Sequence, residues 1–192
     1  MNPAKVLFVA LLAGTLSISI ALYGERWLAE HDAALSLIDR RNESVNSLPD
    51  IRLPDSDGLE VTSNSWAGKV VVLNFWATWC PACLREMPML VRLQEANPGD
   101  RLQVVGIAID DIASVRRFLT EHKVDYQILL GNADSVKLSK RLGNRTSGLP
   151  FTVVFDSLGR RVFSHAGEIS AAQIRARIMP LLNTESRNTD SG

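Results

Sequence analysis

The residues with the clearest chemical potential are two cysteines in the motif Cys80-Pro81-Ala82-Cys83. The uncharged, β-rich run Val70–Trp76 precedes them and predicts a strand buried on both faces. A helix is predicted over Pro81–Glu95, because proline is tolerated in a first turn and apolar residues then recur at helical spacing. Backbone N–H groups and the dipole at a helix start stabilise an anion, so a thiol there ionises readily. We therefore interpret Cys80 as the nucleophile at the exposed end of this helix, and Cys83 as the more buried thiol that resolves a mixed disulfide.

Two other interpretations of the cysteine pair stay open. A purely structural disulfide would stabilise the fold little, because it closes a very short loop. A metal half-site would need further ligands, and the three histidines, His31, His122 and His165, lie far from the pair in sequence and show no ligand spacing. Two cysteines are too few for a four-thiolate zinc site or a disulfide-stapled miniprotein. The pair therefore favours redox chemistry, and no metal site is predicted.

The length and charge of the chain limit the other classes of function. A chain of 192 residues suits one ordinary domain with an appendage. Its formal net charge is zero, so no overall electrostatic field favours a nucleic-acid partner. The basic doublets, such as Arg116-Arg117, are scattered and are interpreted as solvated surface.

Residues 1–23 are predicted to form a transmembrane anchor. The run Val6–Tyr23 is apolar and uncharged, and its length is near the minimum of about 18 residues for a helix that crosses a bilayer. A signal peptide cleaved near Ala21 is the alternative, and both interpretations export the remainder of the chain. Residues 24–47 are then predicted to form a juxtamembrane helix over Trp27–Asp39 and a polar linker.

Strands alternate with helices along the rest of the chain, which predicts an α/β fold with a mixed sheet flanked by helices. Asp110-Asp111 suit the capping region of a helix. The expected helices after Glu95 are Ile112–His122, Ser135–Leu142 and Ser170–Leu182, and the expected strands are Leu102–Ile109, Tyr126–Leu130, Phe151–Phe155 and Arg161–Ser164. Residues 184–192 are predicted to be a polar tail.

The segment from Gly68 to Pro88 (GKVVVLNFWATWCPACLREMP) resembles the active-site segment of the TlpA/ResA/CcmG group of membrane-tethered thioredoxin-like proteins. Leu48–Gly58 resembles the N-terminal hairpin of that group, and the stretch Asp110–Asn144 takes the place of its central insert. The likeness extends to about Leu182. It implies a thioredoxin-like domain over residues 48–183 that carries both additions and is preceded by a transmembrane helix.

The resemblance also implies roles for residues outside the cysteine motif. In the loop Gly148-Leu149-Pro150-Phe151, Pro150 is expected to be cis and to face the cysteine pair, with the backbone at Leu149 offered to a substrate strand. Glu86 stands where the group often has an acid that assists proton transfer near the resolving thiol, and its alternative is a solvated helix-face carboxylate. Phe151 replaces the glutamate of cytochrome-c-maturation members, which disfavours a dedicated apocytochrome substrate.

Four further positions are interpreted from the residues and the likeness together. Trp79 and Pro81 are expected to form an apolar rim where a substrate chain docks, with core packing as the alternative for Trp79. Trp76 is expected in the core. Asn74 takes the position of the buried acid of cytosolic thioredoxins, as in the tethered group.

The predicted function is that of a thiol–disulfide oxidoreductase that reduces protein disulfides through Cys80 and Cys83. The resemblance implies a bacterial inner-membrane protein whose catalytic domain faces the periplasm, a membrane-embedded thiol reductase as electron donor, and no organic cofactor. A copper-delivery module with His165 as a distant ligand is the alternative from another class. A peroxiredoxin-like peroxidase is disfavoured, because Ala77 and Leu73 replace its threonine and proline.

Overall fold

The computed structural model describes residues 46–98 and 101–183. Its helices are α2 (Pro81–Glu95), α3 (Ile112–Glu121), α4 (Ala133–Arg141) and α5 (Ala171–Arg177), with the 3-10 turn η1 (Ser63–Trp66). The strands are β1 (Arg52–Pro54), β2 (Glu60–Thr62), β3 (Val70–Trp76), β4 (Leu102–Ala108), β5 (Gln127–Leu130), β6 (Phe151–Phe155) and β7 (Arg161–Ala166). The predicted thioredoxin-like α/β fold with a mixed sheet is confirmed for this part of the chain.

The central sheet has the strand order β5-β4-β3-β6-β7 in the described residues. β3 pairs in parallel with β4 and antiparallel with β6, so it lies in the middle of the sheet. Every residue of β3 is buried, as the continuous apolar run predicts for a strand covered on both faces. Because β3 and β4 are parallel, the loops that follow them leave the same edge of the sheet.

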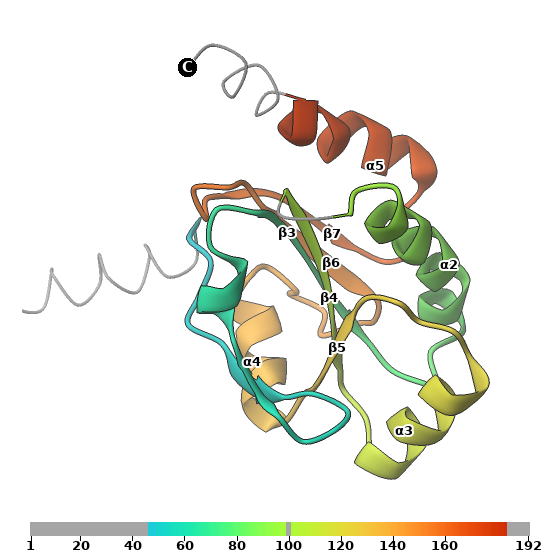
Figure 1. Cartoon of the computed structure of the whole chain (residues 1–192). Helices are drawn as coiled ribbons and strands as arrows, with labels where there is room; N and C mark the ends of the chain where they lie inside the picture. Colours follow the sequence, from blue (N-terminus) through green and yellow to red (C-terminus); the bar gives the residue numbers. More distant parts are fainter. Residues whose placement is uncertain (1–45, 99–100, 184–192) are drawn as a thin grey trace, which may run out of the picture. The chain divides into compact units, whose positions relative to one another are not determined.

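Helices cover both faces of the sheet, as Figure 1 shows. Val70, Val72 and Trp76 of β3 pack on one face in a cluster that includes residues of α2, α3 and α5. The alternate residues, among them Leu73 and Phe75, pack on the other face with α4, η1 and the N-terminal segment. Because successive side chains of a strand point to opposite faces, β3 contributes residues to both apolar clusters.

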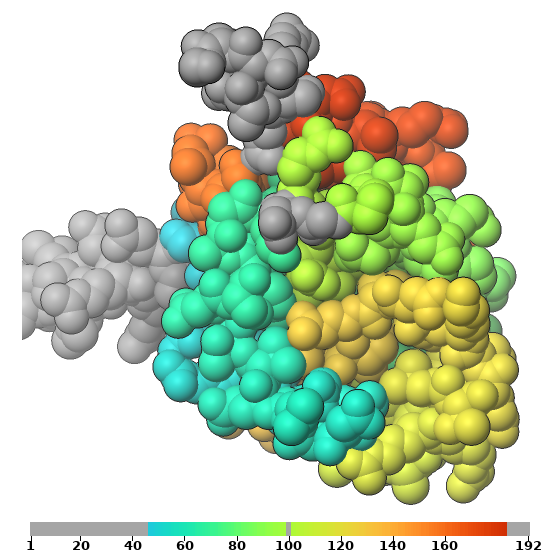
Figure 2. All heavy atoms as spheres, viewed as in Figure 1, coloured from blue at the N-terminus to red at the C-terminus, as the bar shows by residue number. Residues whose placement is uncertain are grey.

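The predicted N-terminal hairpin is formed by β1 and β2, which pair antiparallel. In its turn, Asp55 accepts hydrogen bonds from the backbone N–H groups of Asp57 and Leu59, each at 2.9 Å. The hairpin lies beside β5, to which Asp55 makes an isolated bridge at Leu129. Figure 2 shows its turn against α3, where Arg116 Nε donates to the carbonyl of Ser56 at 2.8 Å.

The predicted boundaries hold closely for most elements, and the last helix differs most. α5 ends at Arg177, and the helical pattern is interrupted at Ile178 before it resumes over residues 179–183. Pro180 accounts for this interruption, because proline lacks an N–H group and its ring crowds the carbonyl four residues earlier.

Three predictions fall outside the described residues: the anchor Val6–Tyr23, the juxtamembrane helix Trp27–Asp39 and the tail 184–192. Over residues 46–98 and 101–183, no helix has both the length and the apolar character needed to cross a membrane.

Candidate active site

The two cysteines form a disulfide at the start of α2, with an S–S distance of 2.04 Å. Cys80 is the N-cap residue of the helix, and Pro81 occupies its first turn as predicted. Cys80 Sγ accepts a hydrogen bond from the backbone N–H of Cys83 at 3.2 Å. This donor points at the sulfur that we interpret as the nucleophile, so it is placed to stabilise a thiolate there.

The exposure of Cys80 differs from the sequence-based expectation. Cys80 is 4 % exposed and Cys83 is 1 % exposed, so both residues are buried and Cys80 does not stand free at the helix end. The order of exposure is the one predicted, but the difference is small. Burial arises because both side chains belong to the apolar cluster between the sheet and α2.

Glu86 lies one turn beyond Cys83 and is 1 % exposed, so the alternative of a solvated carboxylate is wrong. Its Oε1 accepts from Asn74 Nδ2 at 2.7 Å, and its Oε2 accepts from the backbone N–H of Ile169 at 2.7 Å. Asn74 Nδ2 also donates to Thr152 Oγ1 at 3.1 Å. One carboxylate thus joins α2, β3 and the segment before α5.

Burial raises the pKa of Glu86 from an ordinary value of 4.5 to about 7. The hydrogen bonds from Ile169 and Asn74 lower the pKa in opposition to burial, and the nearby charge of Glu168 raises it further. A carboxyl group with this pKa is partly protonated near neutral pH, so it is able to take up or release a proton beside the cysteine pair. Asn74 takes the place of an acid in β3, and the buried acid is supplied by α2 instead.

The Leu149–Pro150 peptide bond is cis, as predicted. Two hydrogen bonds hold the loop around it: Asn144 Nδ2 donates to the carbonyl of Gly148 at 2.9 Å, and the N–H of Gly167 donates to the carbonyl of Pro150 at 2.8 Å. Leu149 is half-buried and packs against both apolar clusters. Its role in binding a substrate strand stays a prediction.

The two tryptophans beside the motif have opposite environments. Trp76 is fully buried, which confirms the expectation that it lies in the core. Trp79 is 67 % exposed, so the alternative of core packing for Trp79 is wrong. Pro81, two residues after Trp79, is exposed as well. Both side chains are therefore accessible to a substrate, while their role as its docking rim stays a prediction.

A contact that the sequence analysis missed holds the loop before Cys80. Asp110 Oδ2 accepts hydrogen bonds from the backbone N–H of Thr78 at 2.9 Å and from Thr78 Oγ1 at 2.5 Å. The pair Asp110-Asp111 suggested a helix cap, and Asp111 is indeed the cap of α3 through Ser114 N–H. The sequence held no signal that Asp110 reaches across to the cysteine loop.

His165, the distant histidine of the copper alternative, lies on β7. Its ring makes a hydrogen bond with Gln173 Nε2 at 3.1 Å and stacks on Phe163. In the part of the chain that the structure describes, no group of three or more histidine, cysteine or acidic side chains is arranged to hold a metal ion.

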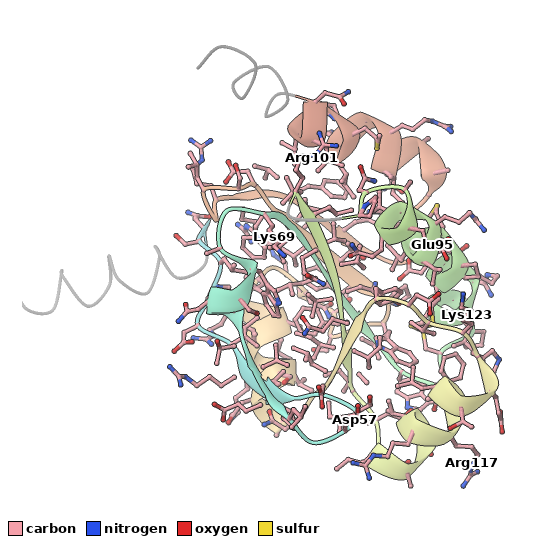
Figure 3. All side chains as sticks on the ribbon, viewed as in Figure 1. Asp57, Lys69, Glu95, Arg101, Arg117 and Lys123 are labelled. Carbon is pink, nitrogen blue, oxygen red and sulfur yellow. A yellow bond between two sulfur atoms is a disulfide. The ribbon has the colours of Figure 1, made fainter. Side chains whose placement is uncertain are left out.

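A groove of about 540 Å³ lies between α2 and the end of α3, and neither cysteine lines it. Its apolar wall includes Met87, Val91 and Phe118. Lys123 also lines the groove, and Figure 3 shows this lysine near Glu95 of α2. Lys123 forms an ion pair with Asp125 at 2.9 Å, and this hydrogen bond raises the pKa of the lysine.

Comparisons with known proteins agree with this geometry. The redoxin family profile matches residues 43–175. The chain is 27 % identical over 170 residues to the thiol-disulfide oxidoreductase ResA of Halalkalibacterium halodurans. The aligned region covers 88 % of this chain and 91 % of that protein. The chain is also 30 % identical over 138 residues to the thioredoxin-like protein YneN of Bacillus subtilis, with 68 % of this chain and 75 % of that protein covered.

A solved structure supports the fold. The crystal structure of a thiol:disulfide interchange protein from Chlorobium tepidum superposes with a TM-score of 0.65 at 24 % identity, and it covers 71 % of this chain and 96 % of that one. The matched residues 43–175 contain the cysteine motif, Glu86 and the cis-proline loop. This chain therefore belongs to the redoxin family, within its TlpA/ResA/CcmG-like group of thiol–disulfide oxidoreductases.

Proposed function

We propose that this thiol–disulfide oxidoreductase is a reductant of protein disulfides that works outside the cytoplasm. The observation that carries the proposal is the Cys80–Cys83 disulfide at the start of α2, where Cys80 Sγ accepts the N–H of Cys83. A disulfide that closes so short a loop adds little stability, whereas its position at a helix start suits reversible exchange.

The reaction follows from the roles of the two sulfurs. In the reduced protein the Cys80 thiolate attacks one sulfur of a client disulfide, and a client thiolate leaves and takes up a proton. Cys83 then loses its proton and attacks Cys80 Sγ, which releases the second client thiol. The client gains two electrons, and the protein returns to the Cys80–Cys83 disulfide. Glu86, one turn beyond Cys83 with a pKa of about 7, is placed to receive the proton of the Cys83 thiol.

The direction of exchange is part of the proposal. Pro81 and Ala82 bring no charge between the cysteines, so the Cys80 thiolate gains stabilisation from the helix start without a further charged group in the motif. A more stabilised thiolate would favour the dithiol form and make the protein an oxidant. The buried carboxylate of Glu86 also favours a reductant, because a negative charge nearby disfavours a thiolate.

We also propose the cellular arrangement. Residues 1–23 anchor the chain in the bacterial inner membrane, residues 24–47 are a helix and linker, residues 48–183 form the catalytic domain in the periplasm, and residues 184–192 are a tail. The uncharged run Val6–Tyr23 supports the anchor. A membrane-embedded thiol reductase is the electron donor in this scheme, because the space outside the cytoplasm oxidises thiols.

The redox potential tests the direction. Equilibrating the full chain with dithiothreitol or glutathione buffers should give a value towards roughly −270 mV, the range of thioredoxin. A value near about −120 mV, the range of a strong periplasmic oxidant, would contradict the proposal.

Topology is tested separately by reporter fusions after Arg41. Activity of a reporter that works only in the cytoplasm would contradict the export of the domain, and a processed amino terminus near Ala21 would contradict the anchor alone.

A further inference from the structure

The loop between β3 and α2 is held from one side by Asp110, which follows β4. One carboxylate oxygen of Asp110 accepts two hydrogen bonds from Thr78, from the backbone N–H at 2.9 Å and from the hydroxyl at 2.5 Å. The second carboxylate oxygen of Asp110 accepts from the N–H of Asp111 at 2.9 Å, which fixes the side chain in this orientation. A hydrogen bond to an ionised carboxylate is about twice as strong as one between neutral groups.

Thr78 is the residue through which this contact reaches the active site. The loop has few other attachments: the N–H of Ile109 donates to the carbonyl of Trp76 before it, and the N–H of Cys80 donates to the carbonyl of Ala77 within it. Trp79 is 67 % exposed, so packing holds its side chain weakly. When the disulfide opens, Cys80 loses its side-chain bond to Cys83, and the contact with Asp110 then carries more of the loop's order.

Two exposed apolar side chains lie close in sequence to the two residues of this contact. Trp79 follows Thr78, and Ile112, which is 50 % exposed, opens α3 two residues after Asp110. Both follow neighbouring parallel strands, which are paired to their ends through Trp76 and Ala108. Since Cys80 is itself only 4 % exposed, a client must lie against its surrounding loops before the sulfurs meet.

We propose that Asp110 is a positioning residue for exchange with protein clients, acting through Thr78 on the loop that carries Trp79 and Cys80. The clients that this loop fits are polypeptide segments with an apolar side chain next to the reactive cysteine, because the exposed side chain of Trp79, directly before Cys80, offers apolar area. The inference rests on the proposed reductase function and names the substrate class of the same site.

Kinetics of three variants of the full chain test the role of Asp110. Thr78→Val removes the hydroxyl donor at nearly constant volume, Thr78→Ser restores it, and Asp110→Ala removes both hydrogen bonds. Asp55→Ala is the matched control, because Asp55 also accepts two backbone N–H groups in a turn but lies in the N-terminal hairpin. In the first assay, each reduced protein is mixed with insulin as the protein disulfide, and the rate of insulin reduction is measured. In a separate assay without insulin, the rate at which iodoacetamide alkylates Cys80 is measured as a function of pH.

For Asp110→Ala we expect kcat/KM towards insulin to fall on the order of tenfold, the loss typical of a hydrogen bond to a charged group, with a smaller fall for Thr78→Val. The fall should appear mainly in KM, since docking is affected. Thr78→Ser should recover most of the activity, and Asp55→Ala should match the wild type. The alkylation profile of Thr78→Val should match the wild type, because the charge of Asp110 is retained.

Two results would overturn the inference: values of kcat/KM within about twofold of the wild type for both Asp110→Ala and Thr78→Val, or an equal loss of insulin reduction and alkylation in Thr78→Val. The reverse reaction, with the oxidised chain and reduced, unfolded ribonuclease, tests the same variants in the other direction. A wild-type chain that oxidises ribonuclease but does not reduce insulin contradicts the proposed function, while the variants still decide the role of Asp110.

Discussion

Replacing Glu86 by glutamine removes the buried carboxyl group that joins α2, β3 and the segment before α5. Glutamine keeps the size of the side chain and one acceptor oxygen, but it carries no proton that titrates. In the wild type both carboxylate oxygens accept hydrogen bonds, from Asn74 and from Ile169. The variant therefore isolates the energetic effect of ionising a buried carboxyl group.

The magnitude follows from the pKa of Glu86, which is 4.5 ordinarily and about 7 in the folded protein. Between these values the unfolded chain has released the proton while the folded protein still holds it, so rising pH favours unfolding. Each tenfold change in proton affinity corresponds to about 1.4 kcal/mol. Glu86 should therefore lower the free energy of unfolding by about 3 kcal/mol above pH 7 relative to pH below 4.5, and the loss should occur across that interval.

Urea unfolding of the oxidised full chain in non-ionic detergent, followed by the fluorescence of the buried Trp66 and Trp76, measures this effect. The free energy of unfolding of the wild type minus that of Glu86→Gln should fall by about 3 kcal/mol from about pH 4 to about pH 8. Glu95→Gln is the matched control, because this exposed carboxylate at the end of α2 lies outside the network. A flat difference for Glu86→Gln, or one that rises with pH, would refute the reasoning.

Three further predictions concern the site and its support. Cys80→Ser should abolish exchange, and Cys83→Ser should accumulate mixed disulfides with clients on non-reducing gels; trapping by Cys80→Ser alone would reverse their roles. Trp79→Ala should change the free energy of unfolding by less than about 0.5 kcal/mol, because the side chain is exposed, while the KM for a protein disulfide should rise; an unchanged KM would remove it from the docking surface. Gly106→Ala should destabilise the fold by about 1–3 kcal/mol in urea unfolding, because its new Cβ would lie 2.9 Å from Trp76 Nε1, and a neutral result would show that the core yields there.

The local features of the site could be predicted from the sequence because each depends on neighbouring residues. The apolar run Val70–Trp76 and the predicted helix Pro81–Glu95 match β3 and α2 at both ends. Asp111 caps α3 as a residue that suits this position. The cis bond before Pro150 was predicted through the family resemblance, since a single proline in a loop does not specify it.

The features that could not be predicted from the sequence depend on contacts between distant segments of the chain. Glu86 and Ile169 are far apart in the chain, and only the packing of α2 on the sheet brings them together, so the helix pattern could not distinguish a buried glutamate from a solvated one. The contact between Asp110 and Thr78 likewise requires the parallel register of β3 and β4. Cys80 is buried because it belongs to an apolar cluster, whereas a position at a helix start predicts exposure.

The N-terminal hairpin has a consequence for the behaviour of the molecule in a crowded compartment. β5 is an outer strand of the sheet, and three of its four residues are buried. An outer strand offers unpaired backbone groups to any other extended chain, which invites aggregation. The bridge between Asp55 and Leu129 places the hairpin beside β5. The bridge between Ser47 and Arg160 places the start of the domain next to β7, the outer strand at the opposite edge of the sheet. The two bridges therefore place other segments of the chain beside both outer strands, where they obstruct pairing with a further extended chain.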